Sequence, residues 1–362
     1  MRRSWLLQLP ISLALAGCAF DSGGAPGADP GIAPDDGSGG GGPGGEDPGP
    51  GGGGPGDPDP VAFQSCTALP YVPGEPTGFD FYENELVALS GGPTHHAQDV
   101  VTSPDAAPSV TATFIYGYLA IDIVDEAVRA SVDTCDGWLD LGEARTDVDG
   151  RVTFALDDKL PVGVYHVVFE VLADGTTASA YIWSLPAGTR LAVFDIDGTL
   201  TTSNTELFAD ILLGDYQPAL YPDATTLTLA HEARGHLPVY LAARPGFLTA
   251  TTRAWLDEQG FAHGIVRYAT RAGDLLPTDG GVGAFKRDAL VELAEAGAAV
   301  DVAYGDAGTD IFAYLSAGLA PDQVWIIGDH GGEEGTHAVS GGWSERAEQV
   351  AAEAQIEQPF SR

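Results

Sequence analysis

Two different patterns of apolar and polar positions divide the chain near residue 188. Between residues 61 and 188, apolar residues alternate with polar ones or form short runs, and the turn pairs Asp149-Gly150 and Asp174-Gly175 separate some of them. Such a pattern is typical of β-strands joined by tight turns, so we expect an all-β sandwich over 61–188. The predicted strands are 110–114, 116–124, 152–156, 165–171 and 178–183.

From residue 189 onward, short apolar runs alternate with helical patterns. This alternation predicts a parallel sheet that is covered by helices on both faces. The α/β domain is expected over 189–345, and a C-terminal tail over 346–362. A terminal helix is expected over 343–358, so it begins just before the end of the domain and continues into the tail. The predicted strands are 191–194, 238–242, 264–268, 300–304 and 324–327, and apolar helical faces include Ala224, Leu227, Ala230 and Ala233, then Phe285, Ala289, Leu293 and Ala296, then Ile311 and Leu315.

The first sixty residues show neither pattern. Residues 1–18 begin with two arginines, continue with an apolar stretch too short to span a bilayer comfortably, and end in LAGC at Cys18. This ending resembles the lipobox of bacterial lipoproteins, which implies cleavage before Cys18 and its acylation. We expect an exported bacterial lipoprotein, anchored by lipid in the outer membrane or at the cell surface. An ordinary secretory signal is the alternative.

Residues 19–60 are mostly Gly, Pro and Asp, which predicts a disordered tether. The chain as a whole carries 16 Lys and Arg against 52 Asp and Glu, a formal net charge of −36. Nucleic-acid binding needs basic surface to neutralise phosphates, so no nucleic-acid partner is expected. At 44% hydrophobic residues, the chain still has enough apolar side chains to build cores.

The chain has three cysteines. With Cys18 lipidated, Cys66 and Cys135 are left as a pair. An exported compartment permits oxidation, so we expect a disulfide between them. Two separate free thiols are the alternative.

The segment VFDIDGTLT at 193–201 is the strongest candidate for chemistry. It places Asp195 and Asp197 directly after a predicted buried strand, and Gly198 lets the chain turn. In open parallel sheets, functional groups gather at the carboxyl ends of the strands. Two carboxylates at that edge therefore indicate a site.

Four separated segments carry a family resemblance. DIDGTLT, YLAARP, FKRDAL and AYGDAGTDIFAY, in this order, resemble the haloacid dehalogenase (HAD) phosphatase superfamily, and are particularly similar to the lipin catalytic region and to the C-terminal domain of Nir-type phosphatidylinositol transfer proteins. The resemblance covers about residues 190–330. It implies an α/β HAD-like Rossmannoid sheet. The region before it resembles sandwiches of the immunoglobulin or transthyretin type, less specifically.

The resemblance also implies an activity: Mg²⁺-dependent hydrolysis of a phosphomonoester, with phosphatidic acid at a membrane surface as the first candidate substrate. Asp195 would attack phosphorus to give an aspartyl-phosphate, and Asp197 would act as general acid and then base. The Mg²⁺ ligands would be Asp195, the Asp197 carbonyl and Asp306, with Asp310 in support. Lys286 would hold the phosphoryl oxygens and the Asp195 carboxylate.

One position departs from the family pattern. The second motif usually ends its strand with Ser or Thr, and here Ala242 stands at that position. Arg244, Thr199 or a backbone N–H would then contact the phosphoryl group instead. Two other functions stay open: a non-catalytic phosphatidic-acid-binding module, and a phosphatase for soluble phosphomonoesters. Nir-type relatives lack the second acid of the first motif, whereas Asp197 is present here and favours activity.

Overall fold

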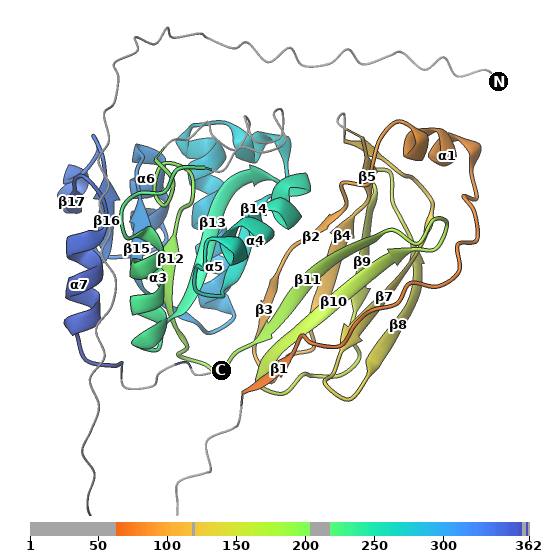
Figure 1. Cartoon of the computed structure of the whole chain (residues 1–362), viewed down its shortest axis with the longest axis horizontal. Helices are drawn as coiled ribbons and strands as arrows, with labels where there is room; N and C mark the ends of the chain where they lie inside the picture. Colours follow the sequence, from red (N-terminus) through yellow and green to blue (C-terminus); the bar gives the residue numbers. More distant parts are fainter. Residues whose placement is uncertain (1–62, 118–119, 203–217, 357–359, 361–362) are drawn as a thin grey trace, which may run out of the picture. The chain divides into compact units, whose positions relative to one another are not determined.

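The computed structural model describes residues 63–117, 120–202, 218–356 and 360 (Figure 1). The predicted signal segment, its lipidation site Cys18 and the predicted tether lie outside these residues. Within the described ranges, no helix is both long enough and apolar enough to cross a membrane.

The first folded region is a β-sandwich, as predicted. Its larger sheet has the strand order β3-β11-β10-β7-β8, with β1 beside β10, and its smaller sheet has the order β2-β4-β9. Most neighbours are antiparallel, but β1 runs parallel to β10 and β3 parallel to β11. The elements are β1 (Gln64–Cys66), α1 (Tyr82–Leu89), β2 (His96–Ala97), β3 (Val100–Thr102), β4 (Ser109–Thr113), β5 (Ile115–Tyr116), β6 (Ile121–Asp122), β7 (Ala127–Asp133), β8 (Trp138–Arg145), β9 (Arg151–Ala155), β10 (Gly163–Val171) and β11 (Thr177–Ser184).

The alternation of apolar and polar residues in this region reflects the packing of the two sheets against each other. Inward-facing side chains of both sheets, including Val110, Phe154 and Phe169, form one buried core. The predicted disulfide is confirmed: Cys66 at the end of β1 is bonded to Cys135, just after β7. The run 116–124, predicted as one strand, instead contains the last residue of β5 and the whole of β6, which pair antiparallel.

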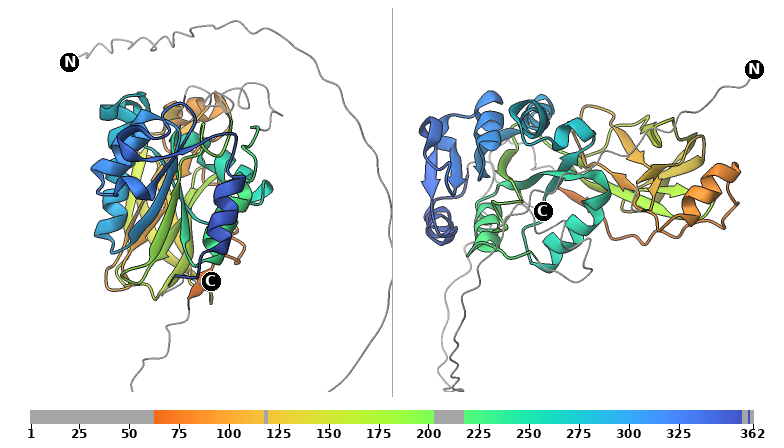
Figure 2. Two further views of the ribbon diagram at one scale, coloured as in Figure 1. Left: turned by 90° about the vertical axis from the view of Figure 1, so that its left-hand side faces the viewer. Right: turned by 90° about the horizontal axis from the view of Figure 1, so that it is seen from above.

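The second region is a six-stranded parallel sheet with the order β14-β13-β12-β15-β16-β17. Helices α5 and α6 pack on one face of this sheet, and α3, α4 and α7 pack on the other (Figure 2). The elements are β12 (Arg190–Phe194), α3 (Ala224–Ala233), β13 (Leu237–Pro245), η1 (Gly246–Leu248), α4 (Thr249–Glu258), β14 (Ile265–Ala269), η2 (Ala272–Leu275), η3 (Asp279–Gly283), α5 (Ala284–Glu295), β15 (Ala299–Gly305), α6 (Gly308–Ser316), η4 (Pro321–Gln323), β16 (Val324–Ile327), η5 (Glu333–Gly335), β17 (His337–Val339) and α7 (Ser344–Ala352).

All five predicted strands of this sheet are present, with small shifts at their ends. The prediction omitted α4 and β17. His337 lies in β17, where its ring stacks on Trp325 with the centroids 4.1 Å apart. The terminal helix is shorter than the predicted 343–358, and Ala347 and Val350 of α7 are buried in the same core as β12.

The sandwich covers the β14 edge of the parallel sheet. Strand β14 is an edge strand of this sheet, and an edge strand carries backbone groups that no neighbouring strand pairs. The Asp99 carboxylate, just before β3, accepts a hydrogen bond from the Val266 backbone N–H of β14 at 2.9 Å. Its other oxygen accepts from Arg253 of α4 at 2.6 Å and from the Tyr181 backbone N–H at 2.8 Å. Asp99 is completely buried, and both of its carboxylate oxygens accept hydrogen bonds. The sandwich and the parallel-sheet region are therefore in contact at this carboxylate.

A buried histidine should make the stability of the fold depend on pH. His95 accepts the Ile115 backbone N–H at Nδ1 (3.1 Å), and its Nε2 lies 2.9 Å from the Thr176 hydroxyl. Burial lowers the pKa of His95 from 6.5 to about 4. The unfolded chain therefore takes up this proton first as the pH falls.

We expect the free energy of unfolding to decrease between about pH 6.5 and pH 4, with His95 contributing up to about 3 kcal/mol of the loss. Urea unfolding across this range should show a smaller decrease for His95→Gln than for the unsubstituted protein. His263→Gln is the control, because that side chain is exposed. An unchanged pH dependence in His95→Gln would contradict the assignment.

Candidate functional site

The candidate site lies where the strand order reverses. The chain runs outward from β12 to β13 and β14, and then crosses back to β15 on the other side of β12. Crevices at such a switch point, outside the carboxyl ends of the strands, are the usual binding sites of this architecture. Asp195 follows β12 and Asp306 follows β15, so both predicted acids stand at this crevice. A pocket of about 230 Å³ opens there, and its lining includes Asp195, Asp197, Arg244, Lys286, Asp306 and Asp310.

A buried lysine connects three elements at the centre of the site. Lys286, in the first turn of α5, donates to Asp195 Oδ1 at 2.5 Å and to Asp310 Oδ1 at 2.6 Å. All three side chains are at most 4% exposed. Burial alone would lower the pKa of Lys286, but the two carboxylates outweigh burial and raise it. The lysine is therefore a fixed cation.

Asp310 is held by its own helix end. Its Oδ2 accepts the backbone N–H groups of Asp306 (3.2 Å) and Ala307 (3.1 Å) at the start of α6. A Cβ added at Gly305 would lie 2.6 Å from the Asp310 Cβ, so this close approach requires glycine. Both Asp310 oxygens thus accept hydrogen bonds from protein donors.

The site carries more negative than positive charge. Its lining contains four carboxylates and two cationic side chains, a formal charge of −2. Oxygen atoms of Asp195, Asp306 and Asp310 lie within 4.8 Å of one another. Burial raises the pKa of Asp195, Lys286 opposes the rise, and the neighbouring carboxylates add to it. A compact set of carboxylate oxygens with excess negative charge fits a hard divalent cation such as Mg²⁺.

Asp197 is clamped by an arginine. Arg244 donates from Nε to Asp197 Oδ2 and from Nη2 to Oδ1, both at 2.8 Å, a two-pronged contact that fixes the carboxylate plane. The Arg244 side chain is only 4% exposed, whereas that of Asp197 is 22% exposed. Arg244, which the sequence predicted to contact substrate, is thus the hydrogen-bond partner of Asp197, the second acid of the first motif.

Two residues expected to contact a substrate do not line the pocket. Thr199 is completely buried and donates its hydroxyl to Asp195 Oδ2 at 2.9 Å, so it orients that carboxylate. Ala242 packs in the core with Phe194, because side chains on a strand alternate between faces. The following residue, Ala243, lines the pocket instead. The structure therefore presents a methyl group, at Ala243, where the second motif was expected to face the site.

Sequence reasoning missed the residues that support Arg244. Thr252 of α4 accepts a hydrogen bond from Arg244 Nη1 at 2.9 Å, and the Arg244 guanidinium carbon lies 5.8 Å from the ring centroid of Trp255. Pro277 and Val282, between β14 and α5, give the pocket an apolar wall. The run TATTR at 249–253 offers no motif and little helical preference, so only the helical spacing of Thr252 and Trp255 was available as a signal.

The folded regions match two domains that occur together elsewhere. Residues 93–183 match the description "PITM 1-3, beta-sandwich domain", and residues 192–328 match "PITM 1-3, LNS2 domain". The chain therefore carries a β-sandwich domain followed by an LNS2 domain, a lipin-like, HAD-related domain. This finding supports the resemblance drawn from the four sequence segments.

The matching proteins are much longer than this chain. Protein retinal degeneration B of Drosophila melanogaster is 29% identical over 268 residues, which cover 72% of this chain and 20% of that protein. Membrane-associated phosphatidylinositol transfer protein 2 of Mus musculus is 30% identical over 244 residues, 65% of this chain and 17% of that protein. The chain thus spans about a fifth of the length of these relatives.

One solved structure among the matches is the D00-D0 domain of Intimin. It is 14% identical, with a TM-score of 0.19 over 25% of this chain and 45% of that chain. A likeness this low has no bearing on fold or function.

Removing the central lysine should destabilise the protein strongly. In Lys286→Met, Asp195 and Asp310 lose their shared cation while remaining buried, and breaking a buried ion pair in this way costs about 3–5 kcal/mol. Urea unfolding should therefore show a loss of that size. The matched control is Lys159→Met, because Lys159 is the other lysine of the chain and is 60% exposed. Equal stability of the two variants would show that the buried pairs do not stabilise the fold.

Proposed function

We propose that this protein is a Mg²⁺-dependent phosphomonoester hydrolase of the HAD type, acting on phosphatidic acid at a membrane surface. The observation that carries the proposal is the Lys286 ammonium, held between Asp195 and Asp310 beside Asp306 at the switch point of the sheet. A phosphate group bound there would meet a fixed cation and an aligned carboxylate at once. The Asp197 carboxylate lies at the same pocket.

These side chains would carry out the proposed reaction in two steps. The Asp195 carboxylate forms a bond to phosphorus while the bond to the ester oxygen breaks, and Asp197 gives that oxygen a proton. Asp197 then takes a proton from water, whose oxygen attacks phosphorus and releases inorganic phosphate and free Asp195. Mg²⁺ held by Asp195, the Asp197 carbonyl and Asp306 would offset the repulsion between carboxylate and phosphate. The Lys286 ammonium offsets the remaining repulsion between the carboxylate and the phosphate, and the Thr199 hydroxyl keeps the Asp195 carboxylate oriented.

A lipid substrate is supported by two observations. The relatives are named as membrane-associated phosphatidylinositol transfer proteins, and phosphatidic acid is the glycerophospholipid whose head group is a phosphomonoester. The apolar side of the pocket, formed by Pro245, Pro277 and Val282, suits an acylated ligand better than a nucleotide or sugar. A lipid anchor at Cys18 would hold this site beside a bilayer.

A second candidate is binding of phosphatidic acid without hydrolysis. The Arg244 clamp favours it, because both Asp197 carboxylate oxygens already accept a charged hydrogen bond from Arg244. Ala243 favours it as well, since it offers no hydroxyl to the phosphoryl group. The same residues would then bind the lipid phosphate, and Asp195 would not form a covalent intermediate.

Phosphate release from short-chain phosphatidic acid should be measured with Mg²⁺ and with EDTA, beside a panel of soluble phosphomonoesters. We expect turnover of the lipid that requires Mg²⁺, and a loss of kcat of more than about 10³-fold in Asp195→Asn because the nucleophile is removed. Asp288→Asn is the control, an exposed acid on the same helix as Lys286. Faster turnover of soluble esters would instead identify a soluble substrate.

Absence of turnover across the whole panel would refute hydrolysis. Flotation with vesicles that contain phosphatidic acid then separates the two candidates. Recovery of unchanged lipid with the protein identifies a binding module, and no recovery in either the Mg²⁺ or the EDTA arm rejects both candidates.

A further inference from the structure

Helix α4 connects the candidate site to the sandwich through two adjacent residues. Thr252 accepts a hydrogen bond from Arg244, the residue that clamps Asp197. The next residue, Arg253, donates to Asp99 of the sandwich at 2.6 Å. Because both contacts come from one turn of a helix, a movement of α4 that breaks the second contact also displaces the first.

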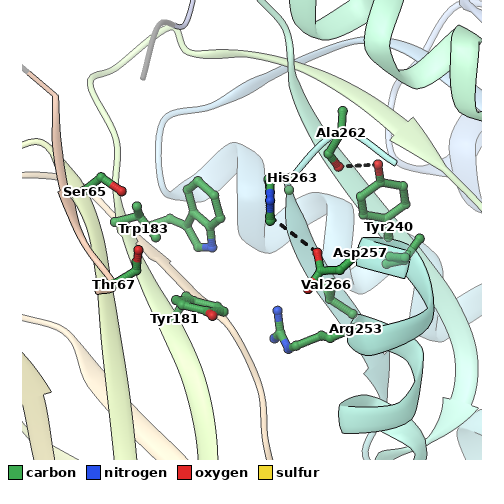
Figure 3. A pocket seen from close by; sticks show the side chains of 13 residues that line it. Ser65, Thr67, Tyr181, Trp183, Tyr240, Arg253, Asp257, Ala262, His263 and Val266 are labelled. Carbon is green, nitrogen blue, oxygen red and sulfur yellow. Dashed lines mark hydrogen bonds and ion pairs between the residues drawn. The ribbon is translucent and has the colours of Figure 1, made fainter. Parts of the chain in front are cut away.

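The sandwich end of this connection is a buried, hydrogen-bonded carboxylate. Asp99 is completely buried, and its carboxylate also accepts the backbone N–H groups of Tyr181 and Val266. Figure 3 shows Arg253 pointing toward Tyr181, and the guanidinium carbon lies 5.2 Å from the centroid of that ring. A cavity of about 270 Å³ lies beside this contact, between Trp183 of the sandwich and α4. Asp99 is thus a fixed point from which α4 is held.

A second sandwich residue holds the other end of the same segment. Gly246 directly follows the Arg244-Pro245 pair, and a Cβ added at Gly246 would lie 2.3 Å from the ring of His96. The His96 ring also packs edge-on against Tyr268, with the centroids 5.6 Å apart. The stretch from residue 244 to 253 is therefore contacted by sandwich side chains at both ends.

We propose that Asp99, together with His96, is a positioning residue for the candidate site. It fixes α4 and the turn before it, so that Arg244 holds Asp197 in one orientation at the pocket. The inference rests on the proposed function, because this orientation matters when a phosphate ligand meets Asp197. It gives the sandwich a role in the chemistry of the neighbouring domain.

The first arm of the test needs no ligand. Hydrogen–deuterium exchange of the full chain is compared for Asp99→Asn and for Asp133→Asn. Asp133 is a matched control, since it is equally buried and accepts the Leu69 and Cys135 backbone N–H groups inside the sandwich. We expect faster exchange over residues 246–258 in Asp99→Asn and no change there in Asp133→Asn. If Asp99→Asn does not fold, Arg253→Gln replaces it, because that side chain is 17% exposed.

The second arm measures whether the Asp99→Asn substitution weakens ligand binding at the candidate site. Affinity is measured for phosphatidylcholine vesicles containing phosphatidic acid, with phosphatidylcholine alone as the blank. We expect Asp99→Asn to bind about 2- to 30-fold more weakly, the range that such coupling spans. If Asp99 acts through Arg244, the double variant Asp99→Asn/Arg244→Ala should bind no more weakly than Arg244→Ala alone.

The possible outcomes distinguish the two proposals. Failure of the unsubstituted protein to bind or hydrolyse phosphatidic acid rejects the proposed function, and the exchange arm then decides whether Asp99 holds α4. Unchanged exchange over 246–258 overturns the positioning role. The positioning role is also overturned if Asp99→Asn binds with unchanged affinity, or if the losses of the two single variants multiply in the double variant. It is overturned as well if Asp133→Asn loses as much affinity as Asp99→Asn.

Discussion

The rest of the site depends on one buried cation. The Lys286 ammonium joins the first turn of α5 to the acid after β12 and the acid at the start of α6. Placing so many charges out of water is unfavourable unless each is paired and hydrogen-bonded. The structure meets this requirement with Thr199 on Asp195 and with backbone N–H groups on Asp310. Because these contacts hold only when the end of β12 meets the starts of α5 and α6, the charge cluster also specifies how the helices pack on the sheet.

The central acids and the sheet could be predicted because their signals are local. Asp195 and Asp306 each follow a short apolar run, and a buried parallel strand is such a run. The lysine was identified from its motif, and its ammonium lies 2.5 Å from Asp195 Oδ1. The disulfide followed from counting cysteines. The side chain that faces the pocket was harder to predict from the sequence. Ala242 and Ala243 are identical in chemistry, and only the backbone geometry at the end of β13 decides that Ala243 lines the site.

Other features were hidden because tertiary contacts create them. Helix α4 begins with a threonine-rich run of weak helical preference, and it is stabilised by burying Trp255 and Leu256 against the sheet. Strand β17 has three residues and pairs only with β16, too short a segment to leave a pattern. Asp99 looks like an ordinary acid of a loop in the sequence. Its importance appears only when the edge strand and the sandwich lie against each other.

The covered edge of β14 has a consequence for how the folded chain meets other chains. An uncovered edge strand is a template for pairing with another strand. Here β14 lies at one edge of the parallel sheet, and the Asp99 carboxylate of the sandwich accepts the Val266 backbone N–H of that strand. This donor is therefore not offered to a strand of another molecule, and the earlier domain protects an edge that the later domain leaves open.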